Sequence, residues 1–216
     1  MSRALQQPLG VILAGGLATR MGGGDKGLLE IGGAPLLRRV IDRLEPQVAG
    51  VALNANGDAE RFESYGLPVL PDSIAGFPGP LAGVLAGLDW AAEQGADSIV
   101  TVAADTPFFP CDLVPQLLLA AEDAPHPLAL ACTPRSGEEA LKSGGGKRLN
   151  RHPTFGLWPV ALADDLRAAL REGLRKVVLW TDRHGAGEAL FPADPFDPFF
   201  NVNTPEDLVR ARELAS

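Results

Sequence analysis

Strand-like and helix-like stretches alternate along this chain of 216 residues, and this order constrains its fold more than any other feature. Residues 9–14 form a short apolar run, as expected of a central parallel strand. After a glycine-rich segment, Pro35 precedes apolar side chains at helical spacing through Leu44. Such alternation is typical of a parallel sheet that helices cover on both faces. We therefore predict an α/β fold with a Rossmann-like, mostly parallel sheet, formed by residues 1–216 as a single domain.

The rest of the chain continues this pattern and becomes less regular in its second half. Further strands are predicted at 48–53, 68–70, 98–104, 128–132 and 154–158. Helices are predicted at 58–65, 81–94, 112–122, 161–174 and 177–181. Thr204, Pro205 and Asp207 form an N-cap, a first-turn proline and a capping-box acid for a closing helix through Leu214. Glycines and basic residues dominate residues 134–151, which predicts a mobile surface loop because a strand resumes soon after it.

The charge balance argues against two classes of partner. The chain has 27 acidic and 19 basic residues and a formal net charge of −8, whereas nucleic acids and anionic membranes favour clustered Lys and Arg. Residues 9–18 are similar to the apolar core of a signal peptide, but the run is shorter than the ~20 residues that cross a bilayer. Cys111 and Cys132 have no CxxC partner and give no metal or redox signature. We expect a cytoplasmic protein that binds neither nucleic acid nor membrane.

A glycine-rich segment at residues 13–27 follows the first predicted strand directly, where open α/β sheets bind their ligands. Glycine has no Cβ, so backbone N–H groups can approach phosphate oxygens, and Arg20 and Lys26 add mobile positive charge. The spacing excludes a Walker A loop, since Gly27 rather than Ser or Thr follows Lys26. The segment predicts a phosphorylated ligand. The alternative is that the two basic side chains form only a solvated surface pair.

Three polar side chains follow predicted strands and should reach one edge of the sheet: Asn54, Asp72 and Asp105. Asp105 comes at the carboxyl end of strand 98–104, where a carboxylate can bind Mg²⁺ together with phosphate and water. The alternative for Asp105 is a helix N-cap or an Asx turn before Pro107. For Asn54 and Asp72 the alternative is the capping of a turn.

The segment LAGG-x₃-RMGG-x-DKGL, at residues 13–28, resembles the opening signature of the molybdenum cofactor guanylyltransferases. Further blocks of this family follow in the same order, at residues 71–72, 78–83, 105–108, 152–154 and 200–208. Together these blocks make the resemblance specific, whereas any one alone is weak. The resemblance implies a nucleotide-diphospho-sugar transferase-like fold. Residues 136–151 depart from the pattern, because this loop looks longer than the family usually has there.

The resemblance also implies a reaction, the transfer of GMP from GTP to the terminal phosphate of molybdenum-molybdopterin, which yields the guanine dinucleotide cofactor and pyrophosphate. It implies catalytic roles for Arg20, Lys26 and Asp105, with Mg²⁺, or Mn²⁺ in its place, on Asp105. The implied GTP-binding residues are Leu13, Ala14, Gly15, Gly16, Gly23, Lys26, Asn54, Asp72 and Asp105. The implied pterin-side residues are Gly79, Gly83, Asn201 and Asn203.

Some of these implied roles have a chemical reason together with an open alternative. Asp72 can accept hydrogen bonds from guanine N1–H and N2–H₂, or else from the ribose. Gly79 and Gly83 flank a predicted helix start that favours an anion, although tight helix packing would also require glycine. For Asn203 the alternative is capping of the closing helix.

Three other functions stay open on the sequence: a cytidylyltransferase acting on the same pterin, a sugar-1-phosphate nucleotidyltransferase, and a non-catalytic nucleotide-binding protein that delivers the cofactor. Cytidine-type relatives tend to carry Ala-Ala-Gly where this chain has Ala14-Gly15-Gly16, and the room at Gly15 suits a purine. Retention of Lys26 and Asp105 argues against the non-catalytic alternative. Besides GTP and molybdenum-molybdopterin, the expected partners are molybdenum-insertion proteins or acceptor enzymes, contacted transiently.

Overall fold

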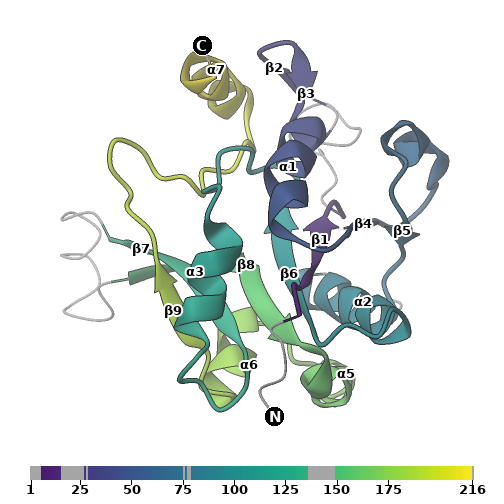
Figure 1. Ribbon diagram of the computed structural model, residues 1–216. Helices are drawn as coiled ribbons and strands as arrows, with labels where there is room; N and C mark the ends of the chain where they lie inside the picture. Colours follow the sequence, from purple (N-terminus) through teal and green to yellow (C-terminus); the bar gives the residue numbers. More distant parts are fainter. Residues whose placement is uncertain are drawn as a thin grey trace.

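One large sheet organises the molecule (Figure 1). The computed structural model describes residues 6–15, 27, 29–74, 76, 79–135 and 149–215. In this part of the chain seven strands pair in the order β5-β4-β1-β6-β8-β7-β9. Their bounds are Leu9–Leu13 (β1), Val51–Asn54 (β4), Val69–Leu70 (β5), Ser98–Ala103 (β6), Ala129–Pro134 (β7), Leu149–Pro159 (β8) and Gly187–Leu190 (β9). Only the pairs made by β8 are antiparallel within these strands. The predicted mostly parallel sheet is confirmed.

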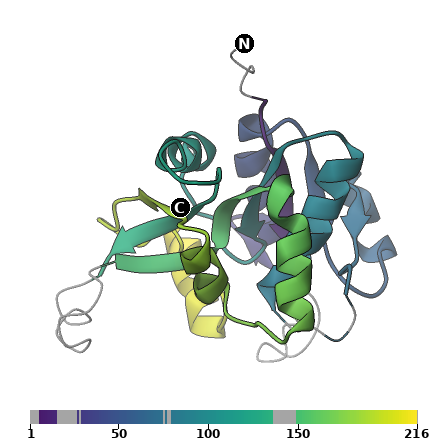
Figure 2. The ribbon, with the colours of Figure 1, turned by 90° about the horizontal axis from the view of Figure 1, so that it is seen from below.

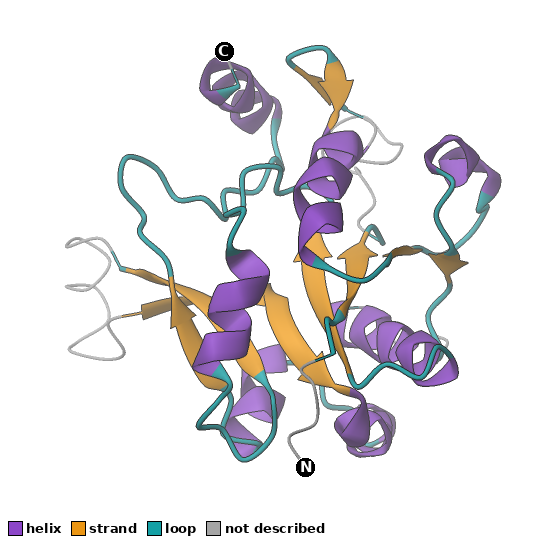
Figure 3. Ribbon diagram, in the orientation of Figure 1, coloured by secondary structure: helices purple, strands orange, loops and turns teal. Residues whose placement is uncertain are grey.

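Helices cover both faces of the sheet, as the alternating pattern predicts (Figures 2 and 3). The α-helices of the described chain are Leu36–Leu44 (α1), Pro80–Glu93 (α2), Leu113–Ala120 (α3), Ala163–Arg171 (α5), Val177–Arg183 (α6) and Pro205–Leu214 (α7). Short 3-10 helices occupy Glu45–Gln47 (η3), Glu60–Tyr65 (η4) and Val160–Leu162 (η5).

The two faces of β1 belong to two separate hydrophobic cores. Ile12 is fully buried in a core that contains side chains of α1 and α3, while its neighbour Val11 is fully buried with side chains of α2, α5 and α6. Successive side chains of a strand point to opposite faces, so this central strand must be apolar at every position. Each such side chain contributes about 1.5–3 kcal/mol on burial.

Several local features differ from the sequence prediction. Residues 58–65 form a 3-10 helix over Glu60–Tyr65 rather than a longer helix, and residues 161–174 divide into η5 and α5. The strands Glu30–Ile31 (β2) and Ala34–Pro35 (β3) form an unpredicted hairpin, and β9 was likewise not predicted. Residues 134 and 149–151 of the predicted loop belong to β7 and β8, because the two strands pair as far as Pro134 and Leu149. Residues 136–148 lie outside the described residues.

The carboxyl-terminal segment is held by a small third core. This core contains four buried side chains: Ile31 of β2, Leu36 of α1, Val202 from the segment before α7, and Ala211 of α7. The predicted capping box of α7 is confirmed, since the Thr204 side chain accepts from the Asp207 N–H and the Asp207 carboxylate accepts from the Thr204 N–H. This core places residues 199–204 beside the end of β6, where the Val202 N–H donates to the Asp105 carbonyl at 2.9 Å.

The order of the strands reverses between β1 and β6, since the chain passes from β1 to β4 on one side and from β6 towards β8 and β7 on the other. In open α/β sheets, ligands bind at the carboxyl ends of the strands at such a reversal. None of the helices in the described ranges is long and apolar enough to cross a membrane.

Candidate active site

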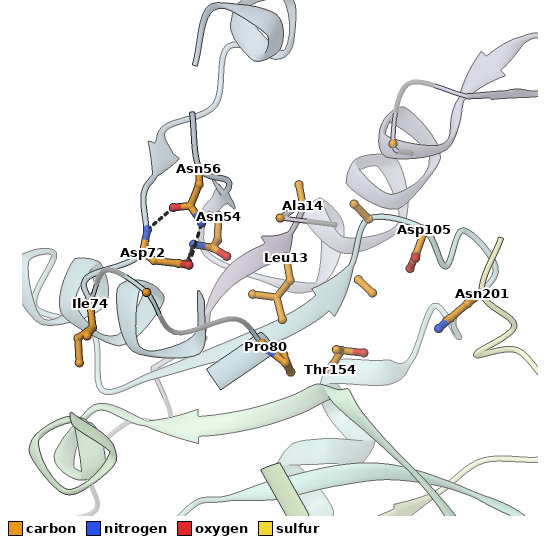
Figure 4. Close-up of a pocket in the computed structure, with 16 residues that line it drawn as sticks. Leu13, Ala14, Asn54, Asn56, Asp72, Ile74, Pro80, Asp105, Thr154 and Asn201 are labelled. Atoms are coloured by element: carbon orange, nitrogen blue, oxygen red, sulfur yellow. Dashed lines mark hydrogen bonds between the residues drawn. The ribbon is translucent and has the colours of Figure 1, made fainter. Parts of the chain in front are cut away.

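A cavity of about 850 Å³ opens at this reversal (Figure 4). The ends of β1, β4 and β6 supply one part of its wall, and β8 and the segment before α7 supply another. Its volume is typical of a small-molecule site. The lining residues are Leu13, Ala14, Gly15, Gly27, Asn54, Asn56, Asp72, Ile74, Gly76, Gly79, Pro80, Ala103, Ala104, Asp105, Thr154 and Asn201.

Most of the site residues named from the sequence that fall in the described chain meet in this cavity. Those that line it are Leu13, Ala14, Gly15, Asn54, Asp72, Gly79, Asp105 and Asn201. Gly83 and Asn203 are not among the lining residues. Arg20, Lys26, Gly16 and Gly23 lie outside the described residues.

Gly83 and Asn203 instead take part in helix packing and helix capping. A Cβ on Gly83 would lie 2.2 Å from Asn54 Oδ1, so α2 can pack against the end of β4 only because residue 83 is glycine. The Asn203 N–H donates to Asp207 Oδ2 at 3.0 Å, beside the capping box of α7.

At one end of the cavity, two asparagines bind the carboxylate of Asp72 (Figure 4). Asn54 Nδ2 donates to Asp72 Oδ1 at 3.0 Å and to the Leu70 carbonyl at 3.1 Å. Asn56 Nδ2 donates to Asp72 Oδ2 at 2.8 Å, and Asn56 Oδ1 accepts from the Asp72 N–H at 2.9 Å. The parallel pairing of β4 with β5 brings these residues together across 16 to 18 positions of sequence.

Asp105 lies at the other end, two residues after β6 ends at Ala103 (Figure 4). Helix α3 begins eight residues later with Asp112 in its N-cap position, so the helix-cap alternative for Asp105 is wrong. Thr106 Oγ1 lies 2.6 Å from Asn201 Oδ1 and 3.3 Å from Asp105 Oδ1. These contacts hold Asn201 next to Asp105 although Thr106 and Asn201 are 95 residues apart.

Strand β8 contributes Thr154 on the Asp105 side of the cavity (Figure 4). Two residues earlier, His152 Nε2 lies 2.9 Å from Thr133 Oγ1, and its ring stacks on Phe199 with centroids 4.3 Å apart. Burial lowers the pKa of His152, and the nearby Asp197 carboxylate opposes this shift. The sequence pattern named residues 152–154 only as a family block. Thr154 was therefore missed as a site residue, and so was Asn56, which also lines the cavity.

The two ends of the cavity differ in their chemistry. On the Asp72 side, the apolar side chain of Ile74 accompanies a carboxylate acceptor, and Leu13 lines the middle of the cavity (Figure 4), which suits a flat ring with N–H donors. Around Asp105, the polar groups of Thr154 and Asn201 suit phosphate or a cation. No cluster of three or more His, Cys, Asp or Glu side chains that could hold a metal occurs in the described ranges.

Two sequence comparisons with known proteins agree on one family. A family model described as "MobA-like NTP transferase domain" matches residues 10–185. A molybdenum cofactor guanylyltransferase from Bradyrhizobium sp. (strain ORS 278) is 50% identical over 210 residues, which cover 96% of this chain and 92% of that protein.

Two solved structures share the fold at lower identity. One is molybdopterin-guanine dinucleotide biosynthesis protein A from Archaeoglobus fulgidus, with 24% identity, a TM-score of 0.68 and coverage of 96% of this chain and 98% of that one. The other is 2-C-methyl-D-erythritol 4-phosphate cytidylyltransferase from Thermus thermophilus, with 22% identity, a TM-score of 0.69 and coverage of 98% and 99%. The fold is thus that of nucleotidyltransferases and does not by itself select a base. The match to the Bradyrhizobium relative establishes the family, because its identity is high and it covers nearly the whole chain. This chain belongs to the molybdenum cofactor guanylyltransferase family.

Proposed function

We propose that this protein is an enzyme that transfers GMP from GTP to the terminal phosphate of molybdenum-molybdopterin, with pyrophosphate as the second product. The name and the 50% identity of its relative support the reaction. The observation that carries the choice of guanine is the Asp72 carboxylate, held in the cavity by Asn54 and Asn56.

Guanine fits the Asp72 end of the cavity. An ionised carboxylate has about four acceptor positions, and the two amides use one on each oxygen. The positions that remain can accept from guanine N1–H and N2–H₂. In this proposal Leu13 and Ile74, which line the cavity, provide apolar contacts for the ring. Adenine and cytosine present an acceptor beside their amino group, which a carboxylate would repel.

The triphosphate then extends from the base towards Asp105. Gly15 lines the cavity, and Gly16, Gly23, Arg20 and Lys26 belong to the glycine-rich segment outside the described residues. In our proposal, Arg20 and Lys26 neutralise the phosphates while the acceptor phosphate attacks the α-phosphorus in line. The protein's task is to position two anions, and no protein nucleophile is needed.

Mg²⁺, or Mn²⁺ in its place, fits at Asp105. This residue brings a hard carboxylate to the cavity, and Mg²⁺ is usually bound by one or two carboxylates together with substrate phosphates and water. When bound, the ion would neutralise charge on the departing pyrophosphate. Asp105 would hold it, and the Thr106 hydroxyl, which contacts Asp105 Oδ1 and Asn201 Oδ1, would position both side chains beside the ion.

In this proposal the acceptor substrate, molybdenum-molybdopterin, binds between Asn201, Thr154 and Gly79, since all three line the cavity. We call this part of the cavity the acceptor end, and the part around Asp72 the base end. Asn203 and Gly83 then support the site from outside, through the α7 cap and the packing of Asn54. Molybdenum-insertion proteins and acceptor enzymes remain the proposed transient partners, and the cytoplasm the proposed compartment. We propose no role for nucleic acid or membrane.

A nucleotide panel tests the function. The protein is incubated with Mg²⁺, a molybdopterin source and each of the four nucleoside triphosphates, and pyrophosphate and the dinucleotide product are measured. GTP should be used and should bind about tenfold or more tightly than CTP or ATP. A preference for CTP would identify a cytidylyltransferase, turnover with sugar 1-phosphates would identify a sugar nucleotidyltransferase, and GTP binding without turnover would identify a delivery protein.

A further inference from the structure

Asn56 makes two hydrogen bonds to one residue of the cavity wall. Its amide nitrogen donates to Asp72 Oδ2 at 2.8 Å, while its amide oxygen accepts from the Asp72 N–H at 2.9 Å. The two bonds close a ring that contains both the backbone and the side chain of Asp72. Only one orientation of the Asn56 amide satisfies both, so the carboxylate is fixed relative to its own backbone.

The backbone of Asn56 is itself anchored. The Arg61 guanidinium donates to the Asn56 carbonyl at 2.6 Å, and the Ala55 N–H donates to the Leu70 carbonyl at 3.0 Å. Gly57 turns the chain directly afterwards with a φ of +86°, a conformation that favours glycine. Asn56 thus reaches Asp72 from a constrained loop.

A carboxylate held in one orientation recognises a different arrangement of hydrogen-bond donors from one that rotates freely. Asn54 and Asn56 occupy one acceptor position on each Asp72 oxygen, which leaves the two oxygens side by side for a ligand. Two parallel acceptors match two neighbouring N–H donors, and among the four standard bases only guanine offers these on its pairing edge. A carboxylate free to rotate would accept equally well from a single donor.

We propose that Asn56 is a positioning residue that sets the selectivity for guanine by holding Asp72 in this orientation. The inference rests on the proposed use of GTP, which it deepens. It assigns Asn56 no contact with the reacting phosphates, so its loss should act on nucleotide binding and selectivity rather than on turnover of bound substrate.

Calorimetry with GTP and ITP tests this role, because ITP lacks only the 2-amino group. The wild-type protein should bind GTP about tenfold or more tightly than ITP, the size expected for one hydrogen bond to a charged group. In Asn56→Ala, GTP binding should fall about tenfold and ITP binding much less, so that the ratio approaches one. Asn56→Asp keeps an acceptor for the Asp72 N–H but opposes two carboxylates, and should reduce the ratio as well.

Asp58→Ala is the matched control. It removes a side chain of similar size from the same loop, one that accepts from the Glu60 N–H and is not among the lining residues. This variant should keep the wild-type ratio of GTP to ITP affinity, and the turnover of Asn56→Ala at saturating GTP should stay near wild type.

A wild-type ratio that survives in both Asn56 variants overturns the inference and leaves the proposed function intact. An equal loss of both nucleotides together with a lowered melting temperature assigns Asn56 a folding role and also overturns it. A wild-type protein that prefers another base overturns the proposed function itself.

Discussion

Asp105 contributes to the cavity through its side chain and to the fold through its backbone. Its side chain lies at the cavity near the Thr106 hydroxyl, while its backbone carbonyl accepts from the Val202 N–H. A substitution that changes only the charge therefore separates the two contributions, because asparagine keeps the side-chain length, one oxygen and the whole backbone.

We expect Asp105→Asn to lower metal-dependent turnover by about 10²-fold or more, which is the size of one lost electrostatic contact in a transition state. The melting temperature should change little, since the backbone bond to Val202 is retained. Turnover against Mg²⁺ concentration and thermal melting are measured on the same variant. Asp112→Asn, at the N-cap of α3, is the control and should keep full activity. Normal turnover in Asp105→Asn would remove Asp105 from the proposed metal site.

Individual residues differ in how far sequence alone could place them. Asn54, Asp72 and Asp105 each follow an apolar run, so the rule for parallel strands brought them to one edge of the sheet. Asn56 lies two residues beyond a strand, and its importance depends on a partner 16 residues away in the next strand's loop. Thr154 lies inside a strand, where sequence does not tell which face points to the cavity.

At the scale of elements, two helices are joined to the loop that carries Asp72. Asp89 of α2 accepts from Arg167 of α5 at 2.5 Å through one oxygen and from Ser73 Oγ at 2.6 Å through the other. Ser73 directly follows Asp72, so this link connects α5, α2 and the base end of the cavity. The hydrogen bond to Asp89 raises the pKa of Arg167 and outweighs the opposing effect of burial.

We expect Asp89→Asn to lower the free energy of unfolding by about 1 kcal/mol or less, because the pair is partly exposed and solvent screens it. Urea unfolding at low and at high salt measures this effect, which should shrink as salt rises. Asp42→Asn removes the more exposed Arg38–Asp42 pair of α1 and should cost less still. A loss that does not depend on salt would mean that Asp89 acts through packing instead of charge.

The elements that escaped prediction share a physical cause. The strands β2, β3 and β9 are two to four residues long, too short to show a period. Gly32-Gly33 between β2 and β3 is a recognised hairpin turn signal and could have revealed that pair. By contrast α1 was predicted almost to the residue, since its five buried side chains follow helical spacing behind Pro35.

At the scale of the whole molecule, the cavity joins two parts of the chain that are built differently. The base end rests on β4, β5 and α2, whose residues follow one another in sequence. The acceptor end depends on β8 and on residues 199–202, which must close against each other from distant positions. His152 and Phe199 lie at this junction, with the His152 ring stacked on Phe199 and Phe155 packed edge-on beside it.

Global stability should therefore depend on the protonation of His152. Burial lowers the pKa of His152 below its ordinary value of 6.5, with Asp197 opposing the shift. The unfolded chain then binds a proton at higher pH than the folded protein does, and stability falls as the pH is lowered wherever the unfolded state binds more protons. The full contribution of neutral His152 to stability is present above pH 6.5, declines as the pH falls below that value, and levels off below the folded-state pKa.

Urea unfolding between about pH 8 and pH 5, the range in which histidine titrates, measures this decline. His152→Gln keeps a group that can bond to Thr133 but does not titrate, and its unfolding free energy should change less across the same interval. An identical pH dependence in the two proteins would show that other groups control acid stability and that the His152–Phe199 junction tolerates the charge.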